Sequence, residues 1–376
     1  MDETDGREPV VPGSQVESEV LLAAGAPVAV SVVIATYNRL DSLLWLLDDL
    51  NGQVGVQGGF DVTVVDDGSR VPVAVEVAAR PTRFPCQVLR RSNGGPGVAR
   101  DAGIRSSKGD IVVILDDDMM IPPTFLAGHQ SVHQTGASVV LGHIRAPRSG
   151  EPPLFERFHQ RTLDRFVAAF SAGEVAVEGA RLCTGNVSFR RGAYLAVGGF
   201  DLSLRRCEDR DIGIRFEEAG YPFALTGAGW SEHRSDHEDV ATWRRRNALY
   251  GELDTVIARK FPGVSRVSPW EFAFHLPKPS LPFLAMAVLF PVLGHVVAGQ
   301  VYAVAAKADK RRFAEVALLG ASLCYGMEYY GGVGRALAND GGTRAVLRSF
   351  REHLRLRKTG ATLGSAVEMA TTVGKS

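Results

Sequence analysis

The feature that most constrains the fold is a regular alternation of apolar runs and amphipathic segments over the first third of the chain. Val28–Ala35 is a continuous β-branched run, typical of a strand covered on both faces. Asp41–Leu50 then places leucines at helical spacing. The pattern continues with a strand at Phe60–Asp66, a short strand at Gln87–Leu89, a helix at Pro96–Ser107 and a strand at Asp110–Leu115. This order predicts an α/β domain with a mostly parallel, Rossmann-like sheet, helices on both faces and ligands beyond the carboxyl ends of the strands.

A polar cluster follows each of the four predicted strands. The clusters are Thr36-Tyr37-Asn38-Arg39, Asp66-Asp67-Gly68-Ser69, the loop Asn93–Gly97 that leads to Arg100, and Asp116-Asp117-Asp118. Any one of them alone is also ordinary turn composition. A parallel sheet brings all four to one edge, so their convergence predicts a single binding site.

The acidic triplet has the chemistry of a cation site. In an extended chain residues i and i+2 point to the same side, so Asp116 and Asp118 should lie together and Asp117 should face away. Two carboxylates held this close repel each other unless a cation lies between them. Pairs of oxygen ligands suit Mg²⁺ or Mn²⁺, which commonly hold the phosphates of a nucleotide.

In this order and spacing the four clusters resemble those of the inverting family 2 nucleotide-sugar glycosyltransferases, which have the GT-A fold; the resemblance covers about Val28–Glu238. It implies that a nucleotide-sugar donor, with a UDP-sugar favoured, binds at this edge together with Mn²⁺ or Mg²⁺. The donor-binding residues that it implies are Thr36, Tyr37, Asn38, Arg39, Asp66, Asp67, Arg100, Asp116 and Asp117, with Asp118 on the metal.

The second half of the resemblance consists of Thr184–Arg191, Gly198–Asp201 and Glu208–Asp211. It implies that Asp209 is the general base, that Gly185, Asn186 and Glu208 lie near the acceptor, and that His233 is a third metal ligand. His237 and His129 are alternatives to His233.

Helical spacing supports Asp209 independently of the resemblance. Ile212, Phe216 and Ala219 mark the expected buried face of a helix, and Asp209 shares that face. Asp211 has Arg215 four residues on, the spacing of a surface ion pair. Asp209 could instead be a first-turn acid favoured by the helix dipole.

Composition narrows the class of protein. Forty-two basic and forty-two acidic side chains cancel, so no net field would gather nucleic acid. The four cysteines are far apart, which argues against a zinc knuckle or a disulfide framework and favours a reducing compartment. Residues 1–27 are acidic, carry prolines and lack the pattern of a secretory signal, so a flexible arm is expected there.

The last third of the chain is apolar and then basic. No Asp, Glu, Lys or Arg occurs from Pro279 to Ala306, and Val316–Val333 is a second apolar stretch. If both stretches crossed a bilayer, the basic loop Lys307–Arg312 would lie opposite a cytosolic catalytic domain, against the positive-inside rule. A helical pair lying in the inner leaflet is therefore predicted over a spanning hairpin, with a helical subdomain packed on the sheet as the alternative. The pattern of Arg344–Lys358 predicts a basic amphipathic helix, which anionic lipid headgroups would attract.

These observations predict a GT-A domain at 28–260, a membrane-associating helical region at 261–358 and a disordered tail at 359–376. Within the GT-A domain, 28–145 would bind the nucleotide and 146–260 the acceptor. The predicted function is metal-dependent, inverting transfer of a sugar to a hydroxyl of a lipid-linked or cell-surface glycan, at the cytoplasmic face of a membrane. The alternatives are a phosphohydrolase that uses Asp116 and Asp118, and a sugar-nucleotide-binding protein without turnover.

Overall fold

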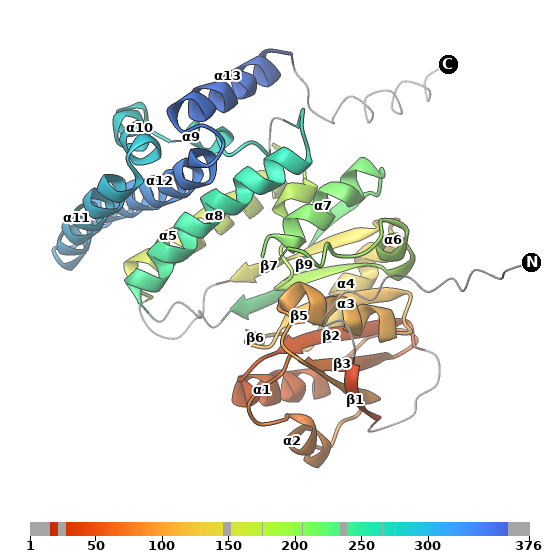
Figure 1. Ribbon diagram of the computed structural model, residues 1–376. Coiled ribbons are helices and arrows are strands. Elements are labelled where there is room, and N and C mark those ends of the chain that lie inside the picture. Colours follow the sequence, from red (N-terminus) through yellow and green to blue (C-terminus); the bar gives the residue numbers. More distant parts are fainter. Residues whose placement is uncertain are drawn as a thin grey trace, which may run out of the picture. The chain divides into compact units, whose positions relative to one another are not determined.

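The chain divides into two compact units in the computed structural model (Figure 1). Unit 1 comprises residues 1–147 and 169–234, and unit 2 comprises 148–168 and 235–376. The structure describes residues 16–21, 28–145, 152–174, 176–204, 206–233, 239–264, 267–274 and 276–359. The division differs from the predicted boundary at residue 260. Helix α8 (Val240–Lys260) and most of α5 (Leu154–Ser171) belong to the helical unit, because Trp243 and Phe155 bury their rings in its core.

Nine strands of the described residues form the sheet of unit 1, in the order β1-β4-β3-β2-β5-β8-β7-β9-β6. Their bounds are β1 Val16–Leu21, β2 Val30–Thr36, β3 Phe60–Asp66, β4 Cys86–Arg91, β5 Ile111–Asp116, β6 Met119–Met120, β7 Val139–Arg145, β8 Asn186–Arg190 and β9 Phe223–His233. Strands β4, β3, β2 and β5 are parallel to one another, whereas β1, β8 and β6 pair antiparallel with their neighbours. The predicted α/β class with a mostly parallel central sheet is confirmed.

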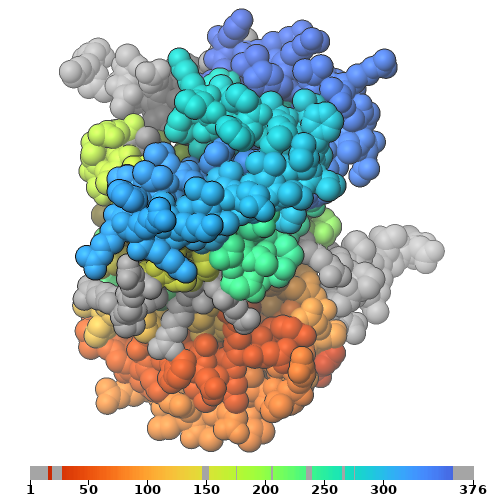
Figure 2. All heavy atoms as spheres, turned by 90° about the vertical axis from the view of Figure 1, so that its left-hand side faces the viewer, coloured from red at the N-terminus to blue at the C-terminus, as the bar shows by residue number. Residues whose placement is uncertain are grey.

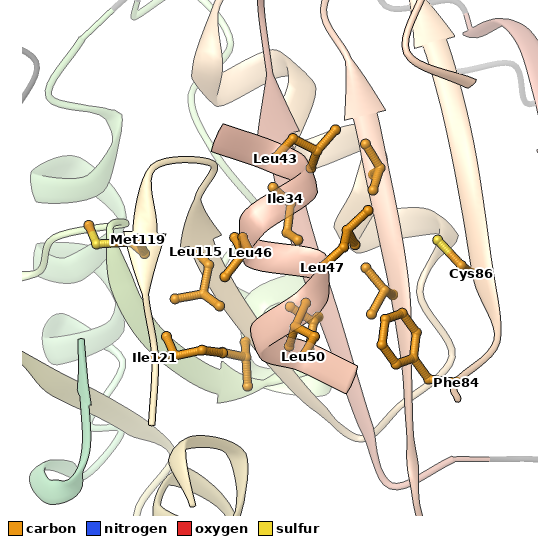
Figure 3. Close-up of a cluster of buried hydrophobic side chains, with 14 of the residues drawn as sticks. Ile34, Leu43, Leu46, Leu47, Leu50, Phe84, Cys86, Leu115, Met119 and Ile121 are labelled. Carbon is orange, nitrogen blue, oxygen red and sulfur yellow. The ribbon is translucent and has the colours of Figure 1, made fainter. Parts of the chain in front are cut away.

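Helices cover both faces of this sheet. The helices of unit 1 are α1 Leu40–Asn51, α2 Ala74–Ala79, α3 Pro96–Ser106, α4 Phe125–Gln134, α6 Arg191–Ala196 and α7 Glu208–Glu218. On one face, Leu43, Leu46, Leu47 and Leu50 of α1 pack against the strands that carry Ile34 and Leu115 (Figure 3). On the other face, Ile104 of α3 and Phe216 of α7 share a buried cluster with Val33 and Val112. Burial on both faces explains why β2 and β5 are continuous apolar runs.

One correction concerns the N-terminal arm. Residues 16–21 were predicted to be loose, but they form β1, which pairs antiparallel with β4. The paired backbone supplies hydrogen bonds that the side-chain pattern of this short segment does not reveal. The remainder of the predicted arm, and the tail beyond residue 359, lie outside the described residues.

Unit 2 is helical. It contains α8, the first part of α5, and α9 Glu271–Phe274, α10 Leu281–Leu289, α11 Pro291–Lys310, α12 Ala314–Ala338 and α13 Thr343–Thr359. The predicted apolar stretch 279–306 is helical, but it breaks between Leu289 and Pro291 into two helices. Glu328, the one acid in the second stretch, is buried in α12 and bound by Arg244 at 2.6 Å and His295 at 2.9 Å. None of the described helices combines the length and the apolarity that a bilayer crossing requires.

Helix α13 is amphipathic, as predicted, but its apolar side is used within the protein. Ala345, Val346 and His353 are buried, and the ring of Phe350 packs edge-on against Trp270. The Trp270 indole also donates to the Ser349 hydroxyl at 2.8 Å. The basic residues of α13 therefore face solvent while its apolar face completes the core of unit 2.

Candidate active site

The strand register brings the predicted polar clusters to one edge of the sheet. Thr36, the last residue of β2, is in register with Asp66 of β3, and Ala35 is in register with Asp116 of β5. The loop after β4 joins them, because Asp67 accepts hydrogen bonds from the backbone of Gly94 at 3.0 Å and of Gly95 at 2.9 Å. The four clusters thus lie together at the carboxyl ends of parallel strands, where α/β sheets bind ligands.

Asp116 and Asp118 of the acidic triplet lie together, as predicted. Asp116 and Asp118 contribute to one group with His233, in which one ligand atom from each residue lies within 4.8 Å of the other two. His233 reaches this group because β6 and β9 pair, with Met119 opposite His233. Its Nε2 atom is 3.4 Å from Oδ1 of Asp118. Two carboxylate oxygens and one imidazole nitrogen fit a divalent cation such as Mn²⁺.

Asp117 faces the interior. It is buried and accepts a hydrogen bond from the Thr36 hydroxyl at 2.7 Å. Burial raises its pKa to about 6, although the hydrogen bond from Thr36 and the charge of Arg39 act in the opposite direction. Arg39 also donates to Asp118 at 2.7 Å. The guanidinium therefore balances the charge of two neighbouring carboxylates, and a divalent cation at Asp118 would compete with it.

The alternative metal ligand His129 lies in the core. Its two ring nitrogens are within 2.8 Å of the Ser188 hydroxyl and 2.9 Å of the Asn186 side chain, and burial lowers its pKa to about 3. The same Ser188 hydroxyl is 2.8 Å from His133. This buried polar network joins α4 to β8 and was not anticipated from the sequence. His237 lies outside the described residues.

Arg100 links Asp116 to Glu208, the neighbour of the predicted base Asp209. Its guanidinium donates to Asp116 at 2.5 Å and to Glu208 at 2.7 Å, and the residue is buried. Burial alone would lower the pKa of Arg100, but Asp116 and Glu208 outweigh that effect and raise it. Asp116 belongs to β5 and Glu208 to α7, and the two acids are 92 residues apart in the sequence. Arg100 therefore fixes the position of α7 against the strand end.

Asp209 lies in the first turn of α7, beside Glu208. Burial raises its pKa to about 7, helped by the negative charges of Glu208 and Asp116. A carboxylate with a pKa close to neutrality has the basicity that proton abstraction from a hydroxyl requires. The residue before the helix, Cys207, has a left-handed backbone with φ 61, and such strain is often found at functional sites.

The helical face predicted for α7 needs two corrections. Ala219 is exposed, not buried, because the helix ends at Glu218. Asp211 and Arg215 do form an ion pair, at 2.6 Å, but Asp211 is fully buried and not at the surface. Arg215 also donates to the Val197 carbonyl at 2.6 Å. The pair thus joins α7 to the residue that follows α6.

Three predicted site residues have partners within the protein. Asp66 is buried and accepts hydrogen bonds from the backbone of Ser69 at 2.8 Å and Val73 at 3.3 Å, so it shapes the turn after β3. Asp67 pairs with the buried Arg91 at 3.2 Å. Asn186 donates to the Gly229 carbonyl at 2.9 Å and is buried. Arg91 was not predicted, although its place at the end of β4 was a usable signal.

The remaining predicted residues lie at the surface of the site. Tyr37 is half exposed, with 49% of its surface accessible. Asn38 has a left-handed backbone with φ 56, and its side chain accepts from the Arg70 backbone at 2.9 Å. A Cβ atom on Gly185 would lie 3.1 Å from Asp116 Oδ2 and 2.7 Å from the Met119 side chain. Gly185 therefore leaves room directly beside the carboxylate.

The mixed sheet, the polar strand ends and the Asp/Asp/His group define the class of protein as a GT-A-type α/β domain. A match to the family described as "Glycosyl transferase family 2" covers residues 31–194. Residues 31–194 therefore match a family 2 glycosyltransferase domain, as the sequence resemblance predicted. The match ends before Asp209 and His233, so the roles predicted for these two residues depend on the geometry described above.

Named relatives agree with the family. The chain is 30% identical over 251 residues to the pre-mycofactocin glycosyltransferase of Mycobacterium tuberculosis, covering 62% of this chain and 48% of that protein. It is 30% identical over 157 residues to the undecaprenyl-phosphate 4-deoxy-4-formamido-L-arabinose transferase of Pectobacterium atrosepticum, covering 41% and 47%. The chain spans about half the length of the curated relatives it matches.

A solved structure shows the same fold. The mannosyltransferase PcManGT from Pyrobaculum calidifontis, in complex with GDP-Man and Mn²⁺, aligns with a TM-score of 0.52 at 19% sequence identity. The alignment covers 79% of this chain and 88% of that one.

Proposed function

We propose that the protein transfers a sugar from a nucleoside-diphosphate sugar, with UDP favoured as the nucleotide, to a hydroxyl group, with inversion at the anomeric carbon. One observation carries the proposal: Arg100 joins a carboxylate of the Asp116/Asp118/His233 group to Glu208, the neighbour of Asp209. A cation-binding group and a carboxylate of raised pKa therefore belong to one site. Transfer from a charged leaving group to a weak nucleophile needs both.

On the donor side, Asp116, Asp118 and His233 would hold Mn²⁺ or Mg²⁺. The bound cation would neutralise the diphosphate as it leaves. Thr36, Tyr37, Asn38, Arg39, Asp67 and Asp117 would line the nucleotide pocket. Arg39 would exchange its ion pairs with Asp117 and Asp118 for the charge of the donor.

On the acceptor side, Asp209 would take the proton of the attacking hydroxyl. The bond from the acceptor oxygen to the anomeric carbon forms while the bond to the diphosphate oxygen breaks. A single displacement of this kind inverts the anomeric carbon and needs no nucleophile from the protein. Glu208 and Gly185 would flank the position from which the acceptor approaches. Glu208 is joined to Asp116 through Arg100, and Gly185 lies beside the Asp116 carboxylate.

The acceptor we favour is a lipid-linked or cell-surface glycan at the cytoplasmic face of a membrane. One of the relatives is named an undecaprenyl-phosphate 4-deoxy-4-formamido-L-arabinose transferase, a name that includes a lipid phosphate.

A thermal-shift panel of nucleoside diphosphates and their sugars, with and without Mn²⁺, tests the donor assignment. A nucleotide that stabilises the protein only when the metal is present would support it. Stabilisation by no nucleotide, together with phosphate release from simple esters, would favour a phosphohydrolase.

Asp209→Asn tests the base. We expect the variant to keep the metal-dependent thermal shift and to lose about 10²- to 10⁴-fold in transfer rate, the usual contribution of general base catalysis. Glu218→Gln is a matched control, because Glu218 is an exposed acid on the same helix. Full activity of Asp209→Asn would refute the assignment.

A further inference from the structure

An apolar surface lies on α10, α11 and the start of α12. Among the described residues, 11 of the 21 exposed large hydrophobic side chains fall within residues 281–319. We call this set the apolar face; it consists of Leu281, Phe283, Leu289, Phe290, Val292, Leu293, Val296, Val304, Phe313, Val316 and Leu319. Val292 is 83% exposed and Val304 is 65% exposed. Helices α11 and α12 lie at the surface in the view of Figure 2.

The apolar face is continuous along α11. Val296 and Val304 lie four and twelve residues after Val292, so the three valines follow one i, i+4 row of the helix, with Gln300 at the remaining position of that row. Phe313, Val316 and Leu319 extend the surface onto α12, which packs directly against α11: a Cβ atom on Gly320 would lie 2.6 Å from the Cβ of Ala305. A scattered set of exposed apolar residues would need no explanation, but a surface of this extent does.

The distribution of residue sizes indicates lipid as the neighbour. The buried residues of α11 are Gly294, Ala298, Tyr302 and Ala305, and the first buried residues of α12 are Ala317 and Ala321. Apart from Tyr302, small residues thus form the buried side of α11 and of the start of α12, while most of the large apolar residues of these segments point outward. Helices surrounded by water show the opposite arrangement, and small residues at helix contacts are typical of helices in lipid.

Charge at the edge of the face favours anionic headgroups. Lys307, Lys310, Arg311 and Arg312 are exposed at the turn between α11 and α12 and form no ion pair with any described residue. The two nearby acids are already neutralised, Asp309 by Arg157 and Glu315 by Arg161. A cationic edge on a surface made mostly of apolar side chains matches the boundary between headgroups and acyl chains.

We propose that the apolar face docks unit 2 onto a bilayer that contains anionic lipid, with the apolar side chains at the acyl boundary and the cationic turn among the headgroups. A second copy of the chain is a poorer occupant. A two-fold contact on this face would juxtapose identical surfaces, and the acids beside it, Asp309 and Glu315, are already paired with Arg157 and Arg161 of the same chain. The docking surface goes beyond the proposed transfer chemistry and does not depend on it.

Co-sedimentation of the full chain with vesicles tests the proposal, without donor or metal. We compare vesicles of phosphatidylcholine alone with vesicles that contain phosphatidylglycerol. We expect association with the anionic vesicles, and a loss of at least about tenfold in apparent affinity for the double variant Val292→Glu with Val304→Glu. The matched control is Val71→Glu with Val75→Glu, which adds the same charge at valines of unit 1 that are 69% and 74% exposed.

The expected result also includes a specific effect of the cationic turn. Replacing Lys310, Arg311 and Arg312 by Ala should remove the preference for phosphatidylglycerol. Failure of the unchanged protein to bind vesicles, or an equal loss in both valine pairs, would overturn the proposal. So would a dimer, measured by light scattering, that only Val292→Glu with Val304→Glu converts to a monomer. Circular dichroism of each variant verifies its fold, and the nucleotide thermal shift tests the transfer site separately.

Discussion

The pKa of Asp209 determines how transfer should depend on pH. A general base works in its ionised form, and burial beside Glu208 raises the pKa of Asp209 to about 7. We expect kcat/KM to fall by about tenfold per pH unit below a midpoint that lies well above the ordinary Asp value of 3.8. A pH–rate profile with a soluble sugar donor measures this midpoint.

Glu208→Gln shows whether that midpoint belongs to Asp209. Removing the neighbouring negative charge should stabilise the ionised base and move the midpoint to lower pH. Glu218→Gln should leave the midpoint unchanged. An unshifted midpoint in Glu208→Gln would mean that another group, such as a metal-binding histidine, controls the profile.

A second prediction concerns Arg39, whose positive charge acts on the same carboxylates as a bound cation would. Arg39→Met removes the guanidinium that binds both Asp117 and Asp118. Without metal, the variant should unfold about 2–4 °C lower, as expected for a loss of about 1 kcal/mol from a partly exposed charged hydrogen bond. Added Mn²⁺ should then stabilise the variant more than the unchanged protein, because the cation no longer competes with Arg39.

The control for Arg39 is Arg70→Met, an exposed arginine in the neighbouring loop. The unfolding temperatures of the unchanged protein, Arg39→Met and Arg70→Met would be compared with and without Mn²⁺. An equal response to Mn²⁺ in all of them would show that the cation does not bind at Asp118.

Residues whose role depends on strand geometry could be predicted, and those that depend on distant partners could not. The i, i+2 rule correctly placed Asp116 and Asp118 together, but it did not reveal that Asp117 and Asp118 share the Arg39 guanidinium. The surface position given to Asp211 was wrong, because helical spacing reveals the Arg215 pair but not the tertiary packing that buries Asp211. Asp66 and Asn186 likewise bind backbone groups that no sequence pattern indicates.

At the scale of elements, the crossing of α8 and α12 yields a prediction on stability. A Cβ atom on Gly332 would lie 1.8 Å from the Ala248 carbonyl oxygen, and one on Gly251 would lie 1.9 Å from that of Tyr329. Gly332→Ala must therefore force the helices apart, and we expect a loss of roughly 1–3 kcal/mol or more. Denaturant unfolding followed by circular dichroism measures it.

The adjacent glycine is the matched control. A Cβ atom on Gly331 would lie no closer than 3.9 Å to any other group. Gly331→Ala should be neutral, or stabilise the helix by up to about 1 kcal/mol, because alanine has the higher helix propensity. Equal destabilisation by both substitutions would contradict the close crossing.

Element prediction succeeded where a single strand or helix carries its own pattern. The strand at Phe60–Asp66 was predicted with its observed bounds, and the helix at Pro96–Ser107 ends one residue earlier. The antiparallel strand β8 and the edge strand β1 were not predicted, because pairing between distant segments leaves no periodicity in the sequence.

At the scale of the whole molecule, tertiary packing decides where the boundary between the two units falls. Helix α8 follows the catalytic segment in sequence, yet Trp243 packs with Tyr302 of α11 in the core of unit 2. Nothing in α8 itself distinguishes a helix that covers the sheet from one that joins a helical unit. The apolar composition of 279–306 did predict a separate helical region, although not the outward placement of its large side chains.

The two activities proposed for the molecule should separate cleanly by mutation. Asp209→Asn should bind vesicles containing phosphatidylglycerol as the unchanged protein does, because Asp209 belongs to unit 1 and the apolar face to unit 2. Val292→Glu with Val304→Glu should keep the full thermal shift with nucleotide and Mn²⁺ while losing vesicle binding. Raising the salt concentration should weaken vesicle binding, because screening acts on the exposed cationic turn. A loss of the nucleotide response in the valine variant would instead mean that the apolar face supports the fold of the catalytic unit.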